Sequence, residues 1–177
     1  MDGFPNVFNE CECKSKSDPD KSVRIKIQEV PEDMHEQVVE FMVNYFLPDE
    51  PLARSINMIG EEVSVQTYKQ ILLLVLKQNL SLVALSEDGQ LIGVLLFTVF
   101  SNGDAKPPQL PGVALEKMRK LFDEIKTEDI IAALGTDQHL QDMGICVHPE
   151  YRGWGIGEAM LRAGNDLGAL ILGLEPS

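Results

Sequence analysis

The feature that most limits what this chain can fold into is a glycine-rich loop between an apolar run and an amphipathic segment. The run Asp142 to Val147 predicts a β-strand, and the loop RGWGIG occupies residues 152–157. In the helical pattern that follows, Met160, Leu161 and Leu167 are expected to face inward. Glycines let successive backbone N–H groups converge, and a helix start adds unpaired donors with partial positive charge. Strand, loop and helix together predict a phosphate-binding site.

The spacing of the glycines separates three kinds of phosphate-binding loop. A P-loop needs lysine after its last glycine, but Glu158 stands there. A dinucleotide fingerprint, G-x-G-x-x-G, matches at Gly153 and Gly155 and has Glu158 in place of its third glycine. Glu175 lies near the distance expected for a ribose-binding carboxylate, so a dinucleotide-binding fragment stays open. The pattern R-x-x-G-x-G is complete in residues 152–157. A loop that serves packing alone is the remaining alternative.

The rest of the chain alternates between strand and helix patterns. An Asp-Gly pair between two apolar runs is a strong hairpin signal, and no internal repeat is present. We therefore expect an α/β fold with a mixed (α+β) sheet, in which a terminal β-α-β unit places two strands in parallel. The expected strands are residues 23–30, 82–85, 91–100, 142–147 and 169–174, and the expected helices are residues 31–47, 61–80, 115–125, 127–135 and a segment from 157 to about 168.

The first 22 residues are polar and rich in Ser, Lys, Asp and Pro, which predicts a disordered leader. They lack the apolar segment of a secretory signal, and no run approaches the roughly 20 apolar residues that span a bilayer. Cys11 and Cys13 form only a C-x-C pair, so we expect free thiols and no metal site. Cys146 is expected to be a buried small hydrophobe. These features predict a cytoplasmic, soluble protein without membrane association.

The chain is strongly acidic, with 15 Lys and Arg against 28 Asp and Glu, a formal net charge of −13. Long-range repulsion argues against nucleic acid or an anionic membrane as a partner. An acidic body favours cationic partners instead, and the commoner meaning of such a charge is a soluble acidic surface. The sequence does not indicate an oligomeric state.

Three segments carry a resemblance to a known family. VHPEYRGWGIGEAML (Val147 to Leu161) resembles the acetyl-CoA loop of the GCN5-related N-acetyltransferases (GNAT). FLPDEPLARS and SEDGQLIGVLLF are similar to the insect-type arylalkylamine N-acetyltransferases, including the dopamine-acetylating branch. The resemblance covers residues 23–168 and implies a GNAT acyl-CoA N-acyltransferase fold in residues 23–177. Because the family continues further, we expect that fold to be incomplete at its C-terminal end, after the loop helix and one short strand.

The resemblance also implies a set of site residues for transfer of an acetyl group from acetyl-CoA to an arylalkylamine. Glu50, in the D-E-P motif, matches the family's proposed general base, and Asp49 would help to shape an acidic entrance for the amine. The backbone of Ile145, Cys146 and Val147 would bind the pantetheine arm. The pyrophosphate would lie against the amides of Arg152, Gly153, Trp154, Gly155, Ile156, Gly157 and Glu158.

The chemistry leaves two roles open for Glu50. An alkylammonium resembles lysine, with a pKa near 10.4, and an ordinary glutamic acid titrates near 4.3, so direct proton transfer is uphill by roughly 8 kcal/mol. Glu50 therefore acts as a base only with help from desolvation or a bridging water, or it binds the cation while the neutral amine reacts. His148 is a second candidate base. The rival class of function is a non-catalytic CoA-binding or partner protein.

Overall fold

The computed structural model describes residues 4–101, 109–125 and 138–171, without the side chains of residues 123–125. The strands are β1 (Val7–Lys14), β2 (Ser22–Glu29), β3 (Leu82–Ser86), β4 (Leu91–Ser101) and β5 (Gln138–Val147). The longer helices are α1 (His35–Phe41), α3 (Glu62–Leu76), α4 (Val113–Ile125) and α6 (Ile156–Ile171). The shorter helical segments are η1 (Glu32–Met34), the π-helical η2 (Met42–Phe46), α2 (Pro51–Ser55), η3 (Met58–Gly60) and η4 (Pro149–Tyr151).

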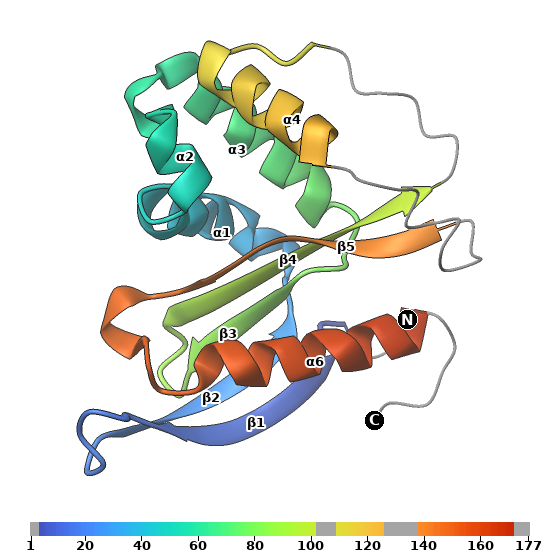
Figure 1. Cartoon of the computed structure of the whole chain (residues 1–177). Helices are drawn as coiled ribbons and strands as arrows, with labels where there is room; N and C mark the ends of the chain where they lie inside the picture. The colour runs from blue at the N-terminus through green and yellow to red at the C-terminus, as the bar shows by residue number, and fades with distance from the viewer. Residues whose placement is uncertain (1–3, 102–108, 126–137, 172–177) are drawn as a thin grey trace.

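The five strands form one sheet in the order β1-β2-β3-β4-β5, and every neighbouring pair is antiparallel. Helices α1 to α4 cover one face of this sheet, and α6 lies across the other (Figure 1). Alternation along each strand divides the core accordingly. Val83 and Val94 pack on the α1–α3 side, whereas Ile27 and Leu95 pack on the α6 side. The predicted α/β class is confirmed.

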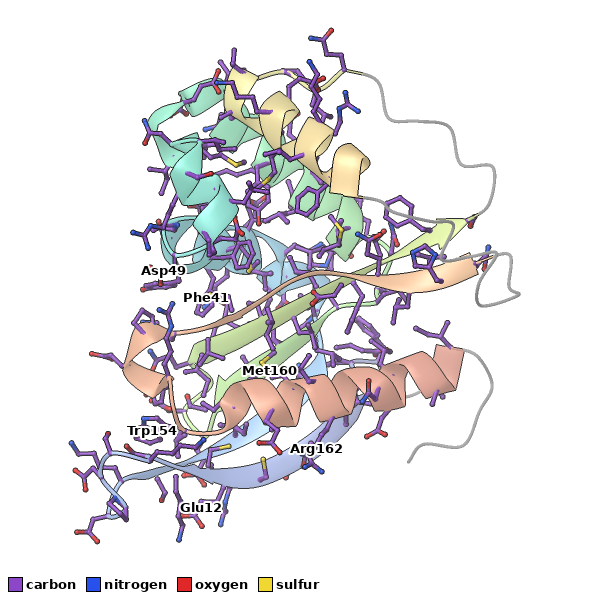
Figure 2. The ribbon with its side chains drawn as sticks, in the orientation of Figure 1. Glu12, Phe41, Asp49, Trp154, Met160 and Arg162 are labelled. Atoms are coloured by element: carbon purple, nitrogen blue, oxygen red, sulfur yellow. The ribbon has the colours of Figure 1, made fainter. Side chains whose placement is uncertain are left out.

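Helix α6 lies close to the sheet because glycines remove side chains from the contact. A Cβ on Gly93 of β4 would be 2.6 Å from the Met160 sulfur, and Figure 2 shows Met160 on the side of α6 that faces the strands. Gly164 likewise packs on the Phe97 ring. Met160 and Leu167 are buried as predicted, but Leu161 is 48% exposed, which contradicts its predicted inward position. The buried stripe of α6 continues instead through Ile156 and Ala163.

The prediction of a disordered leader over residues 1–22 is wrong for residues 7–14. Residues Val7–Lys14 form β1 and pair with β2 in an antiparallel register. Cys11 and Cys13 lie on the face that packs against α6, and Cys13 is buried, while Glu10 and Glu12, which alternate with them, are exposed. The strand signal was the alternation of cysteine with charged residues, because cysteine behaves as a small hydrophobe. The cysteines of the described residues are free thiols, as predicted.

The C-terminal prediction also needs correction. Residues 169–171 continue α6 rather than beginning a strand, so the predicted strand 169–174 is wrong there, and residues 172–174 lie outside the described part. The predicted parallel pairing is absent from the described residues, whose strand pairs are all antiparallel. The predicted helix 127–135 and Glu175 also lie outside the described residues. The hairpin at Asp88-Gly89 is confirmed, with Gly89 at φ +81°.

Candidate active site

The loop between β5 and α6 adopts a backbone conformation that only glycine adopts easily. Gly153 and Gly155 have φ values of +80° and +82°, and a Cβ on either would meet no atom within 4 Å. The glycines are therefore required by the turn of the chain, and the space beside them is open. The Gly153 carbonyl accepts from the backbone N–H of Lys16 at 3.3 Å, which ties the loop to the β1–β2 turn.

The amides of this loop form the most distinctive feature of the site. The first hydrogen bond of α6 runs from the Ala159 N–H to the Gly155 carbonyl at 3.1 Å. Within the described residues, the six N–H groups from Gly153 to Glu158 have no acceptor. They stand together at the start of a 16-residue helix, where the helix dipole adds partial positive charge. An array of this kind binds a phosphate or pyrophosphate.

Strand β5 borders the loop and is the last strand in the sheet order, so its outer edge has no paired strand among the described residues. The Val147 carbonyl accepts from Nε of Arg152 at 2.9 Å, which places the Val147 backbone on the outer edge. Because neighbouring residues alternate in direction, the Ile145 backbone shares that edge and the Cys146 backbone faces β4. The outer edge offers hydrogen bonds from Ile145 and Val147, but not from Cys146.

A bulge in β5 brings this strand against the segment that carries the acidic residues. The pairing of β4 with β5 shifts between Leu96 and Phe97, where Gly144 has φ +134° and its N–H donates to the Asp142 carboxylate at 2.6 Å. A Cβ on Gly144 would lie 3.0 Å from the Phe46 ring. The π-helical η2 thus packs directly on β5, and the D-E-P turn that follows η2 lies beside the strand.

The two acidic residues of that turn have different partners. The Glu50 carboxylate accepts from the Ala53 N–H and so caps α2, while the Glu50 N–H donates to the Phe46 carbonyl at 2.8 Å. The Asp49 carboxylate forms an ion pair with Arg152 at 2.5 Å. Figure 2 shows Asp49 at the end of the molecule where the chain turns from β5 toward α6. The fold therefore brings Asp49 and Glu50 to the loop, about 100 residues away in sequence.

Comparison with known proteins identifies this arrangement. Residues 39–168 match the model of the acetyltransferase (GNAT) family. The chain belongs to that family. No curated protein matches this sequence. Among solved structures, the protein designated insect arylalkylamine N-acetyltransferase 7 from the yellow fever mosquito Aedes aegypti is similar, with 26% identity and a TM-score of 0.88. The match covers 97% of this chain and 72% of that one.

Two further structures share the fold at lower identity. Arylalkylamine N-acetyltransferase 2 from Aedes aegypti is 23% identical, with a TM-score of 0.73. The polyamine N-acetyltransferase of Drosophila melanogaster is 19% identical, with a TM-score of 0.68. Each match covers 85% of this chain and 72% of the other. The predicted GNAT fold and the resemblance to insect arylalkylamine N-acetyltransferases are confirmed, and the family uses acetyl-CoA as acyl donor.

Within this GNAT domain, sequence reasoning missed Tyr68. Its hydroxyl is buried without a hydrogen-bond partner in the described residues. Burial raises the pKa of Tyr68, with smaller contributions from Cys146 and Glu50. Tyr68 therefore lies near both the acidic turn and β5. The sequence held a weak signal for it, since tyrosine stands on the buried face of α3 that Val65 and Leu72 also occupy.

Two other residues of the GNAT site have roles that the structure makes clearer. Burial raises the pKa of the Cys146 thiol to about 11, although Arg152 opposes the shift. The thiol is protonated near neutral pH and poorly suited to nucleophilic attack. His148 packs edge-on against Tyr45 and Tyr151, with ring centroids 4.7 and 5.9 Å apart, and its Nδ1 accepts from the Glu150 N–H at 3.4 Å. These contacts give His148 a packing role at the end of β5.

The loop also has a second side, toward β1. Trp154 packs edge-on against Tyr151 and lines an open hollow of about 380 Å³ between β1 and the start of α6. The Glu158 carboxylate pairs with Arg162 at 2.9 Å, and that pairing, with a weaker effect of Lys16, lowers the pKa of Glu158. None of the described helices is both long and apolar enough to cross a membrane. In the same residues no group of three or more His, Cys, Asp or Glu side chains could hold a metal ion.

Proposed function

We propose that this GNAT protein transfers the acetyl group of acetyl-CoA to the primary amine of a small arylalkylamine, of the dopamine, serotonin or tryptamine type. The observation that carries the proposal is a row of six amides that have no acceptor within the described residues, beside the outer edge of β5, which pairs with no described strand. The amides from Gly153 to Glu158 suit the pyrophosphate of the donor. The outward backbone groups of Ile145 and Val147 suit the amide groups of its pantetheine arm.

This assignment answers the difficulty posed by the net charge of −13, because CoA is itself an anion. The loop attracts the pyrophosphate through fixed backbone dipoles, which act over a short range and need no net positive charge. The contribution of Arg152 is small, since Asp49 neutralises it. The acidity of the remaining body favours the approach of a cationic amine.

The surroundings of Glu50 favour an aromatic monoamine over a polyamine. Asp49 forms an ion pair with Arg152, whereas the Glu50 carboxylate pairs with no cation among the described residues. One carboxylate matches one ammonium group. Tyr45, Phe46 and Tyr68, all partly buried, lie on the elements around this turn and supply the apolar and aromatic surface that an arylalkyl group needs.

The proposed reaction is direct attack. The amine nitrogen forms a bond to the thioester carbonyl carbon, the carbon–sulfur bond breaks, and the products are the N-acetyl amine and CoA. Glu50 accepts the amine proton, directly or through water, or holds the ammonium near the site until it deprotonates. An acyl-enzyme at Cys146 is not part of the proposal, because the buried thiol is protonated near neutral pH. The thiolate of CoA takes up a proton as it leaves.

The test combines binding with turnover. We would titrate the chain with acetyl-CoA and with NAD, then measure thiol release with dopamine, tryptamine and spermidine. We expect micromolar acetyl-CoA binding, no NAD binding, and release that is faster with the two arylalkylamines. Glu50→Gln keeps an oxygen that can cap α2 but cannot take a proton, and it should lower thiol release at least about 100-fold. Glu36→Gln, on the exposed face of α1, is the matched control.

Each alternative has its own result in the same test. Tight acetyl-CoA binding without thiol release favours the non-catalytic CoA-binding protein. Binding of NAD in place of acetyl-CoA favours the dinucleotide-binding fragment. A folded chain that binds neither ligand overturns the assignment of the loop.

A further inference from the structure

The side chain of Arg152 connects two parts of the site that are far apart in sequence. Its Nη1 donates to the Asp49 carboxylate at 2.5 Å, and its Nη2 donates to the Tyr45 carbonyl at 3.4 Å. Its Nε donates to the Val147 carbonyl at 2.9 Å. One guanidinium group therefore fastens the acidic turn after η2 to the end of β5.

These contacts make Arg152 a poor ligand for an incoming pyrophosphate. Each guanidinium nitrogen already faces a protein oxygen, and a planar fork held by three acceptors has one orientation. Two of its five N–H groups remain, but to turn its fork toward a phosphate Arg152 would have to exchange one anion, Asp49, for another. The gain in attraction from such an exchange is small. The unpaired amides from Gly153 to Glu158 need no exchange, because no protein group occupies them in the described residues.

We propose that Arg152 is a positioning residue for acetyl transfer and not a ligand of the acetyl donor. Through Asp49 and the Tyr45 carbonyl it holds the acidic turn, and with it Glu50, beside the outer edge of β5. Through its Nε it fixes the Val147 carbonyl on that edge. This inference rests on the proposed function, because it assigns the amine side to Glu50 and the donor side to β5 and the loop amides.

The consequence is a separation of donor affinity from turnover. In Arg152→Ala, the dissociation constant for acetyl-CoA should change by less than about threefold, because the amides remain in place. The value of kcat should fall at least about tenfold, because a displacement of Glu50 by about 1 Å misaligns amine and thioester. Calorimetry gives the first quantity and thiol release the second.

Two further variants separate positioning from charge. Arg152→Lys keeps the charge but cannot reach three oxygens, so kcat should stay low. Asp49→Asn removes the ionic partner of Arg152, and the double variant Asp49→Asn/Arg152→Ala should be no slower than Arg152→Ala alone. Asp49 is 53% exposed, so its loss should leave the fold intact. A tenfold weaker affinity in Arg152→Ala with kcat unchanged would overturn the proposal, as would additive losses or full rescue by lysine.

A measurement without donor keeps this inference separate from the proposed function. Hydrogen exchange of residues 46–53 should become faster in Arg152→Ala, while exchange in the β3–β4 hairpin stays unchanged. If hydrogen exchange over residues 46–53 is unchanged in Arg152→Ala, the positioning role of Arg152 is overturned. This outcome does not depend on which substrate the chain acetylates. If residues 46–53 exchange faster in Arg152→Ala but the chain does not bind acetyl-CoA, the positioning role of Arg152 is supported and the proposed function is rejected.

Discussion

Helices α4 and α6 begin in the same way, but protein groups accept hydrogen bonds from the first backbone N–H groups only at α4, within the described residues. Each follows a glycine in the left-handed region, Gly112 at φ +97° and Gly155 at φ +82°. At the start of α4, the Glu61 carboxylate accepts from two backbone N–H groups at 2.7 and 2.8 Å, and the Ser64 hydroxyl accepts from a third at 3.0 Å. At the start of α6, no protein group accepts from the amides within the described residues.

The difference shows how a helix start becomes a binding site. In both places the unpaired donors and the helix dipole attract an anion. The chain supplies that anion itself for α4, and Glu61 then joins α3 to α4 as part of the fold. It leaves α6 open, and no described side chain lies within 4 Å of a Cβ placed on Gly153 or Gly155. The open helix start is the one that lies beside the free edge of β5.

The largest effect is expected from a substitution that makes the start of α6 resemble that of α4. Gly155→Glu should lose most of its affinity for acetyl-CoA. A carboxylate placed among the loop amides would take their hydrogen bonds as Glu61 does at α4. Each charge-assisted hydrogen bond is worth about 1.5–3 kcal/mol, so acetyl-CoA affinity should fall about 100-fold or more. The control is Gly89→Glu, which has the same backbone strain, with φ +81° and open space, in the β3–β4 hairpin. Equal acetyl-CoA affinities in the two variants would count against the loop as the binding site.

A second prediction compares alanine at two glycines that share the backbone conformation but not the surroundings. At Gly112 a Cβ would lie 2.7 Å from the Ser64 Cα and 2.8 Å from its nitrogen, whereas at Gly153 it would meet nothing. Gly153→Ala should lose about 1 kcal/mol of unfolding free energy from its backbone strain alone. Gly112→Ala should lose about 3 kcal/mol, because backbone atoms must also move apart. Urea unfolding measures the unfolding free energy of both variants. Equal losses would show that Gly112 does not pack tightly against Ser64 at the start of α4.

The sequence was informative where a local pattern has one structural solution. The loop after β5, the Asp-Gly hairpin and the apolar stripe of α3 were predictable, because each needs only neighbouring residues. Pairings between distant segments were not predictable in this way. The contact of Arg152 with Asp49 depends on the whole sheet, and the attachment of Lys16 to Gly153 depends on β1, which the composition of residues 1–22 concealed. Tyr68 was missed because its polar atom lies at the end of an otherwise apolar stripe.

The hydrogen bonds of Glu61 at the start of α4 should also affect the stability of the chain in acid, and this effect should be smaller. The Ser64 hydroxyl and then the amides of Ala114 and Val113 hold the pKa of Glu61 below its usual value of 4.5. A carboxyl whose pKa is lowered by folding stabilises the fold at pH values above its unfolded pKa. That stabilisation is lost as the pH falls through the folded pKa. Glu61→Gln should therefore lower Tm at pH 7 and show a shallower loss of stability below about pH 4.5 than the parent chain.

The matched control for this prediction is Glu62→Gln, one residue further along, where the carboxylate accepts from the Gln66 side chain and from no other described residue. It should follow the acid profile of the parent. Unfolding monitored by circular dichroism between pH 2 and pH 7 compares the three chains. An identical acid profile for Glu61→Gln and the parent would mean that the carboxylate does not close α4. The comparison of α4 with α6 would then rest on the Ser64 hydroxyl and on the space around the two glycines, and not on the Glu61 carboxylate.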